Sequence, residues 1–325
     1  MSHCYYAEIL AIEYEHGRIV LGPECCVQEA RPWQLRLMAQ MSQALPATLE
    51  EFMQRPEYYL DTYGRPASCL SCTCPYSHDC ERPRTNFRKI KVSIDGSCNL
   101  QCLHCCIDKR TRIYDPIRRQ AQLRCLDWAK QHAETIHLTI RGEPFISGAQ
   151  GYTAKWLLNL NENDPVQRIE ALSNYTLLTP ALQDQLWQYL QSQHKVLQVA
   201  ASCDAFDRAH YEQIRQGGHF ATTINNMRHA HELGLLQLIN YVMMPWNEEV
   251  TDTIGEQLLA LGFDPQRYPL TVELIPYQDH DGTNYRHTVI NGHGQIVNEH
   301  FRNALVSLQR CGFTPATSAV GKKKE

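Results

Sequence analysis

Apolar and polar positions alternate between two patterns from residue 89 onward. Short runs with a two-residue or continuous apolar pattern are separated by longer stretches whose apolar residues recur every three or four positions. The first pattern predicts strands and the second predicts helices, and their alternation is typical of parallel βα units in an α/β fold. The predicted strands span residues 89–95, 135–140, 168–172, 196–203, 236–243 and 270–274. The first predicted helix begins at Asp115-Pro116. The others span about residues 152–160, 180–190, 221–233, 248–261 and 301–311.

The first 86 residues follow a different pattern. Two β-prone apolar runs, residues 6–12 and 18–21, predict a β-hairpin. A helical pattern starts at Arg31-Pro32-Trp33, and a second short helix is predicted over residues 48–59, with a threonine cap and a glutamate three positions later. The sequence therefore predicts a small α+β extension ahead of the α/β region.

Composition narrows the class of protein. The 325 residues carry a formal net charge of −4, so no basic field marks a nucleic-acid binder. No apolar run is long enough to cross a membrane, and the first residues lack the basic and apolar regions of a secretory signal. Fourteen cysteines in such a chain favour metal binding over disulfides and indicate a reducing, cytoplasmic setting.

Three cysteines follow the strand predicted over residues 89–95. Cys98, Cys102 and Cys105 stand at spacing C-x3-C-x2-C. Cysteine thiolates hold iron–sulfur clusters, and three of them would leave one iron of a [4Fe–4S] cluster with an open position, as in metal sites that perform chemistry. A zinc site, or cysteines that cluster in a reduced core, would also explain the spacing taken alone.

This loop, at the end of a first strand, resembles the signature of the radical S-adenosylmethionine (radical SAM) superfamily. The resemblance implies a partial (β/α)6 TIM-type barrel, whose open iron chelates the amino and carboxylate groups of SAM. It also implies reductive cleavage of SAM to a 5′-deoxyadenosyl radical, which abstracts a hydrogen atom from a substrate. In barrels of parallel strands the active site lies at the carboxyl ends of the strands, where this loop is predicted.

Later stretches resemble the family's motifs in the same order. Arg141-Gly142-Glu143-Pro144 resembles Gly-Gly-Glu-Pro, although an arginine replaces the first glycine. The resemblance implies that Gly142 and Glu143 hold the SAM amino group, to which a carboxylate makes a charge-assisted hydrogen bond. Ser173 and Asn174 resemble the Thr-Asn-Gly position, which implies contacts with the SAM ribose or carboxylate.

Two further motifs and two backbone contacts complete the implied SAM site. Ser202 lies in a stretch that resembles Ser-Ile-Asp-Gly and is an implied SAM ligand. Arg215 lies in Ile214-Arg215-Gln216-Gly217, which resembles Ile-Arg-Gly, and its guanidinium fork suits the SAM carboxylate. His104 and Ile275 are implied to contact adenine through their backbones. A turn or surface role is the alternative for Ser173, Asn174, Ser202 and Arg215.

A second group of cysteines precedes the barrel. Four cysteines within residues 69–80, among almost no aliphatic side chains, favour an auxiliary [4Fe–4S] cluster, and a structural zinc site is the alternative. The common accessory module of the family lies after the barrel, so its ligands cannot be transferred. The candidate ligands are Cys69, Cys72, Cys74 and Cys80, with Cys25, Cys26 or both as alternatives to one of these four.

These expectations combine into one functional hypothesis. Residues 1–86 form the cysteine-rich extension, residues 87–276 form the barrel, and residues 277–325 close it. The expected enzyme modifies a peptide or protein residue, as family members with auxiliary-cluster segments often do, and takes its electron from a donor such as flavodoxin or ferredoxin. The alternatives are a small metabolite substrate, or a non-catalytic protein that binds zinc or a cluster.

Overall fold

The computed structural model describes residues 9–15, 18–23, 87–93, 95–105, 115–138, 142–277, 289 and 295–317. The helices predicted over residues 31–59 and the proposed auxiliary-cluster ligands lie outside this part of the chain. Those ligands are Cys25, Cys26, Cys69, Cys72, Cys74 and Cys80.

One sheet of nine strands organises the described residues, in the order β2-β1-β3-β4-β5-β6-β7-β8-β9. Strands β1 and β2 pair antiparallel, and every other neighbouring pair is parallel. The strands are β1 (Ile9–Glu15), β2 (Arg18–Pro23), β3 (Phe87–Ser93), β4 (Ala133–Leu138), β5 (Arg168–Ser173), β6 (Val196–Ser202), β7 (Leu238–Met243), β8 (Thr271–Pro276) and β9 (Thr314–Thr317). Strands β2 and β9 lie at the two edges of the described sheet and do not pair with each other. The barrel is therefore partial and open, as the sequence predicts.

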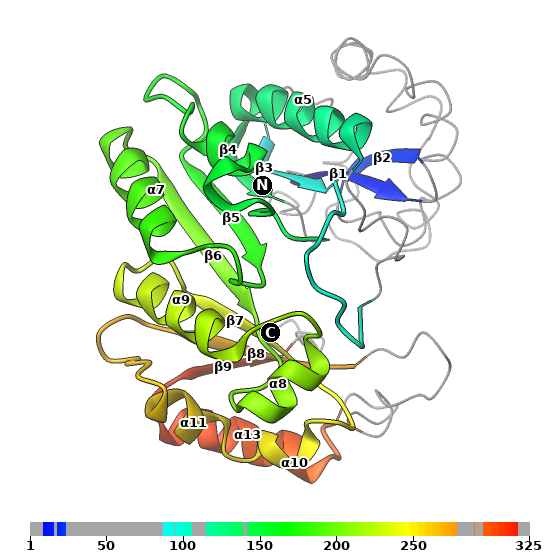
Figure 1. Ribbon diagram of the computed structural model, residues 1–325, viewed down its shortest axis with the longest axis vertical. Coiled ribbons are helices and arrows are strands. Elements are labelled where there is room, and N and C mark those ends of the chain that lie inside the picture. The colour runs from blue at the N-terminus through cyan, green and yellow to red at the C-terminus, as the bar shows by residue number, and fades with distance from the viewer. Residues whose placement is uncertain are drawn as a thin grey trace, which may run out of the picture.

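Helices form an outer layer around this curved sheet (Figure 1). They connect successive parallel strands, which is the arrangement of a TIM-type barrel. Among the described residues, no helix is long and apolar enough to cross a membrane. The helices are α5 (Pro116–His132), η5 (Gly148–Gln150), α6 (Tyr152–Leu157), α7 (Pro180–Ser192), α8 (Arg208–Ile214), α9 (Phe220–Glu232), α10 (Glu248–Thr251), α11 (Ile254–Ala260) and α13 (Glu299–Arg310).

The central strands have two different faces. Alternate residues such as Ile136, Val199 and Leu274 are fully buried, and they share one hydrophobic core with the apolar residues of the helices. Because successive side chains of a strand point to opposite sides, the residues between them face away from the helices. We call that second side the inner face; it is half-buried and largely polar, with Lys89, Glu170 and other polar side chains.

The predicted strands are confirmed, and the structure adds elements at both edges of the sheet. Strand β1 of the predicted hairpin pairs with β3, so the hairpin continues the sheet. The sequence analysis missed β9, whose four residues include a proline and give no strand pattern. It also missed α8, a helix of seven residues.

The single helix predicted over residues 248–261 was wrong. Helix α10 ends at Thr251 and α11 begins at Ile254. The Thr251 hydroxyl donates a hydrogen bond of 2.7 Å to the carbonyl of Asn247, one turn earlier. Such bonding of threonine back to the preceding turn bends helices, which explains a break at this position.

Candidate active site

The loop that carries the three cysteines leaves the carboxyl end of β3. We call residues 95–105 the cluster loop. At its start, the buried Asp95 side chain accepts hydrogen bonds from the backbone N–H of Ser97 (3.0 Å) and from its hydroxyl (2.5 Å). An aspartate that accepts from the residue two positions ahead forms a local turn, which directs the chain away from the strand. The Arg119 side chain of α5 lies 3.4 Å from the same carboxylate and ties the turn to the helix layer.

The predicted motif after β6 holds the middle of the cluster loop. The backbone N–H of Gln101 donates to the carbonyl of Gln216 at 2.9 Å, and that of Leu103 donates to the carbonyl of Ile214 at 3.0 Å. Gly217 has a φ of +87°, a conformation that favours glycine. The Ile214–Gly217 motif and the cluster loop, far apart in sequence, are therefore joined directly by their backbones.

Gly142 brings the second motif against the same loop. Its φ is +87°, and a Cβ atom there would lie 2.7 Å from the backbone carbonyl carbon of Gly96 and 2.7 Å from the carbonyl oxygen of Ser97. The next residue, Glu143, donates its backbone N–H to Ser97 at 2.8 Å. Only glycine permits this close approach. Residue 142 must therefore be glycine for its backbone to pack against that of Gly96 and Ser97.

The buried Glu143 carboxylate binds two of the predicted site residues, Ser173 and Asn174, and one residue that was not predicted, Phe145. It accepts hydrogen bonds from the Ser173 hydroxyl (2.9 Å), the Asn174 backbone N–H (2.7 Å) and the Phe145 backbone N–H (2.9 Å). Burial raises the pKa of Glu143 to about 7, although these hydrogen bonds and the positive charge of Arg215 oppose the shift. A carboxylate has about four acceptor positions, so Glu143 keeps one for a further donor such as an ammonium group.

The three cysteines are half-buried free thiols, and nitrogen donors lie close to the sulfurs of Cys98 and Cys102. The Asn174 side-chain amide lies 3.8 Å from the Cys98 sulfur, the backbone N–H of Leu100 lies 3.4 Å from the same atom, and Arg215 Nη1 lies 3.8 Å from the Cys102 sulfur. Burial raises the pKa of Cys98 to about 11 and also raises that of Cys102. These thiols would therefore need bound cations to ionise, and the donors suit the resulting thiolates.

This donor set fits a cubane cluster. Within the described part of the chain, no three His, Cys, Asp or Glu side chains lie close enough to hold one metal ion. A [4Fe–4S] cluster needs no such convergence, because each of its thiolates binds a different iron. Hydrogen bonds to the sulfurs are among the interactions that tune such clusters.

Asp204 is the central site residue that the sequence analysis did not single out. Its fully buried carboxylate lies 2.6 Å from Arg215 Nε and 3.4 Å from His104 Nε2, and accepts a hydrogen bond of 3.1 Å from the backbone N–H of Val242. Burial alone would raise the pKa of Asp204, but the positive charges of Arg215 and His104 hold it below its ordinary value. The only sequence signal was its position two residues after Ser202, within the motif that contains both.

The remaining predicted residues lie at the ends of strands. Ser202 ends β6 and is paired in register with Asn240, while Ile275 lies near the end of β8 and is paired with Val242. Both are half-buried. His104 was predicted as a packing group with a backbone contact, and its imidazole in fact faces Asp204. The structure thus gathers Glu143, Ser173, Asn174, Arg215 and His104 at the cluster loop, while their roles toward SAM stay predictions.

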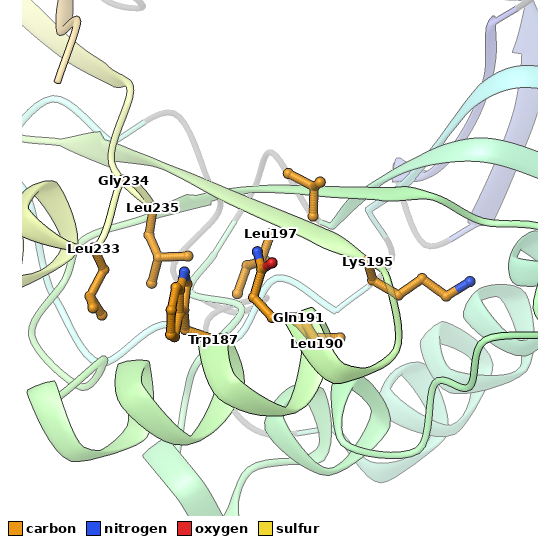
Figure 2. Close-up of a pocket in the computed structure, with 9 residues that line it drawn as sticks. Trp187, Leu190, Gln191, Lys195, Leu197, Leu233, Gly234 and Leu235 are labelled. Carbon is orange, nitrogen blue, oxygen red and sulfur yellow. The ribbon is translucent and has the colours of Figure 1, made fainter.

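A surface pocket of about 90 Å³ lies at the other end of the strands (Figure 2). Figure 2 shows it between α7, the segment that follows α9, and the first residues of β6. The active sites of such barrels lie at the carboxyl ends of the strands, so this pocket is separate from the cluster loop. Its labelled residues are Trp187, Leu190, Gln191, Lys195, Leu197, Leu233, Gly234 and Leu235.

Comparisons with known proteins place the chain in a family. A comparison with curated protein sequences finds no match. Matching solved structures include Streptococcus suis SuiB bound to S-adenosylmethionine (12% identity, TM-score 0.49, covering 88% of this chain and 64% of that one). They also include anSMEcpe with bound AdoMet (16%, 0.44, 59% and 51%) and a radical SAM methyltransferase from Sphaerobacter thermophilus (16%, 0.43, 70% and 65%).

The matched regions make up between half and two thirds of each of those structures, and likenesses this distant assign no reaction. The family model is more specific. The model described as "Radical SAM superfamily" matches residues 92–256, which is more than half of the chain and includes the cluster loop and every motif through Arg215. The chain therefore belongs to the radical SAM superfamily.

Proposed function

We propose that this chain is an enzyme that reductively cleaves SAM and modifies a peptide or protein residue. Family membership implies a [4Fe–4S] cluster and SAM as cofactors. When bound, the cluster supplies the electron that cleaves SAM to a 5′-deoxyadenosyl radical, which removes a hydrogen atom from the substrate. The electron comes from a partner such as flavodoxin or ferredoxin.

The arrangement around Glu143 carries the proposal. The Ser173 hydroxyl and the backbone N–H groups of Phe145 and Asn174 fix the carboxylate beside the cluster loop. One acceptor position remains for the SAM ammonium group, and a buried carboxylate makes a strong charge-assisted hydrogen bond to such a group. The positive charge of a bound ammonium group would also offset the effect of burial, which raises the pKa of Glu143.

Arg215 supplies the opposite charge. Asp204 holds its Nε edge, and Nη1 lies 3.8 Å from the Cys102 sulfur, so the guanidinium is fixed between the carboxylate and the cluster loop. Its remaining N–H groups suit the SAM carboxylate, because a guanidinium offers five donors in a fixed fork. Glu143 and Arg215 would thus orient the two ends of the amino acid part of SAM.

A peptide substrate rests on two supports. The first is the resemblance to family members that combine a radical SAM barrel with extra cysteine-rich segments. The second is β2, which ends the sheet among the described residues. An extended peptide can add a strand to an edge of this kind through main-chain hydrogen bonds.

The test of the proposal is anaerobic. The full chain is reconstituted with iron and sulfide, supplied with dithionite and SAM, and assayed for 5′-deoxyadenosine. We expect the product from the wild type, and Glu143→Gln should weaken SAM binding by about tenfold to a hundredfold, because the charged ammonium group then meets a neutral amide in place of a carboxylate. Glu232→Gln, on the exposed surface of α9, is the matched control and should match the wild type. Bound zinc without iron, and no nucleoside product, would refute the proposal.

A further inference from the structure

The inner face of the barrel carries two carboxylates in contrasting surroundings. Glu170 on β5 lies 2.5 Å from the Lys89 ammonium and 3.4 Å from His137 Nδ1, so a cation of the chain neutralises it. Burial alone would raise its pKa, but hydrogen bonds from His137 and Lys89 lower it to about 2. On β3, β4 and β5, the inner-face side chains of Lys89, His137 and Glu170 are therefore paired with one another.

Glu273 on β8 has no such cation among the described residues. Its neighbours in the strand, Val272 and Leu274, are fully buried in the core, so strand alternation directs Glu273 to the inner face. Burial raises the pKa of Glu273, and no charged group of the described chain offsets that effect. A half-buried carboxylate in this state gains stability from a cation brought by a ligand.

Asn240 supplies an independent observation beside it. Asn240 on β7 is paired in register with Glu273, and side chains at paired positions of neighbouring strands share a face. Its Oδ1 atom is buried and has no hydrogen-bond partner among the described residues. A buried acceptor without a partner costs free energy, and native structures rarely leave one unless something binds there. Two acceptors thus stand side by side, both without donors.

The position of the pair relates it to the proposed SAM site. Ser202, the predicted SAM ligand, is the register partner of Asn240 on its other side. Val242 and Ile275, the pair next above on the same face, include the predicted adenine contact. Two residues of a strand span about 7 Å, so the Asn240–Glu273 pair lies one layer deeper in the barrel than that contact. A substrate group seated there would lie beside Ser202 and one layer below the predicted adenine contact.

We propose that Asn240 and Glu273 form a subsite for a positively charged N–H donor of the substrate, a primary ammonium or a guanidinium group. The proposal rests on the proposed function and adds to it that the modified peptide carries a basic side chain near the reacting residue. Glu273 would pair with the charge, and Asn240 Oδ1 would accept one of the remaining N–H donors.

The test measures binding to the full chain, anaerobically reconstituted and loaded with SAM, without reductant. Calorimetry compares the pentapeptide Ala-Ala-Lys-Ala-Ala with its norleucine analogue, which keeps the alkyl chain and lacks the ammonium group. We expect the lysine peptide to bind about tenfold or more tightly, and Glu273→Gln to remove most of that preference. Glu232→Gln serves again as the exposed control and should keep the preference.

A charge reversal guards against a variant that merely misfolds. Glu273→Lys should invert the selectivity, so that Ala-Ala-Glu-Ala-Ala binds more tightly than the lysine peptide, a gain that unfolding cannot produce. Equal binding of the lysine and norleucine peptides to the wild type, or binding of neither, would overturn the subsite. So would a Glu273→Gln variant that weakens SAM binding as much as peptide binding, since the carboxylate would then belong to the SAM site.

Different results would overturn the proposed function and the proposed subsite. A wild type that makes 5′-deoxyadenosine and shows no preference between the peptides overturns the subsite alone. A wild type that binds the lysine peptide selectively but never cleaves SAM overturns the proposed function and leaves a cation-binding barrel.

Discussion

Asp204 joins three parts of the chain that are distant in sequence. Its carboxylate meets the Arg215 guanidinium, the His104 imidazole of the cluster loop and the backbone of β7 at Val242. Its own backbone carbonyl accepts a hydrogen bond of 2.7 Å from the Asn247 side chain. A buried charge needs a partner, and here the partner also reaches the Cys102 sulfur. Asp204 is therefore a positioning residue, which fixes Arg215 for its proposed contact with SAM.

Asp204→Asn removes the negative charge of this residue and keeps its size, so the variant tests the role of the charge. The amide can still accept the Val242 N–H, but it leaves the buried Arg215 charge without a counter-ion, which costs about 3–5 kcal/mol of the free energy of unfolding. The double variant Asp204→Asn with Arg215→Met removes the unpaired charge and should recover most of that loss. Both variants should bind SAM weakly. Urea denaturation and SAM affinity measure the two effects, and a single variant as stable as the wild type would contradict the ion-pair argument.

At the scale of elements, two loops and one helix end meet at the carboxyl end of the sheet. The cluster loop follows β3, the Gly142-Glu143 turn follows β4, and the Ile214–Gly217 motif follows α8. Backbone hydrogen bonds between these segments, and not side chains alone, set their spacing. The geometry of the site therefore depends on how closely the backbones approach.

Gly142→Ala should disturb the site more than the same substitution at Gly148, another glycine with a positive φ. Gly148 also has a positive φ, +53°, but a Cβ atom there would meet only a carbonyl oxygen at 3.4 Å. Alanine at either position costs about 1–2 kcal/mol of backbone strain. At Gly142 the added carbon would also displace the backbone of residues 96–97, to which Glu143 is bonded. We expect Gly142→Ala to lose SAM binding and Gly148→Ala to keep it; equal SAM affinities would show that the close approach is dispensable.

The ion pairs of the inner face should make stability depend on pH. Glu170 has a pKa of about 2 in the folded chain, below its ordinary value of 4.5. Its contribution to stability is therefore present above pH 4.5 and is lost as the pH falls toward 2. Since the group is partly exposed, solvent screening limits that contribution to about 1 kcal/mol. Wild type and Glu170→Gln should differ in urea denaturation at pH 6, and the difference should shrink as the pH falls toward 2; a gap that stays constant would contradict the assignment.

At the scale of the whole molecule, the sequence predicted what periodicity and chain order determine. The six barrel strands and their parallel order were predictable, because each strand has an apolar run and each is followed by a helical stretch. The gathering of Glu143, Ser173 and Asn174 was also predictable, since they lie at or just after the carboxyl ends of the neighbouring strands β4 and β5. Carboxyl ends of adjacent parallel strands meet at one edge of a sheet.

Contacts that depend on side-chain direction or on the curvature of the sheet were not predictable. Lys89 and Glu170 meet although β4 lies between their strands, a contact that depends on the direction of both side chains. Arg215 reaches Asp204 because α8 turns the chain back between them, and no apolar periodicity indicates a helix as short as that one. The hairpin was predicted, but its parallel pairing with β3 is a long-range contact that local pattern does not encode.

The number of metal clusters is a property of the whole chain, and iron content tests it. If the N-terminal cysteines hold an auxiliary cluster, the reconstituted wild type should contain about eight iron atoms, and replacing Cys98, Cys102 and Cys105 together by alanine should leave about four. Cys125→Ala removes a buried core thiol of α5 and is the matched control, so it should keep the iron content of the wild type. A triple variant that retains zinc and no iron would show that the N-terminal cysteines form a zinc site. If it binds neither metal, and the wild type holds about four iron atoms, the cluster loop alone binds a cluster, since each [4Fe–4S] cluster accounts for four.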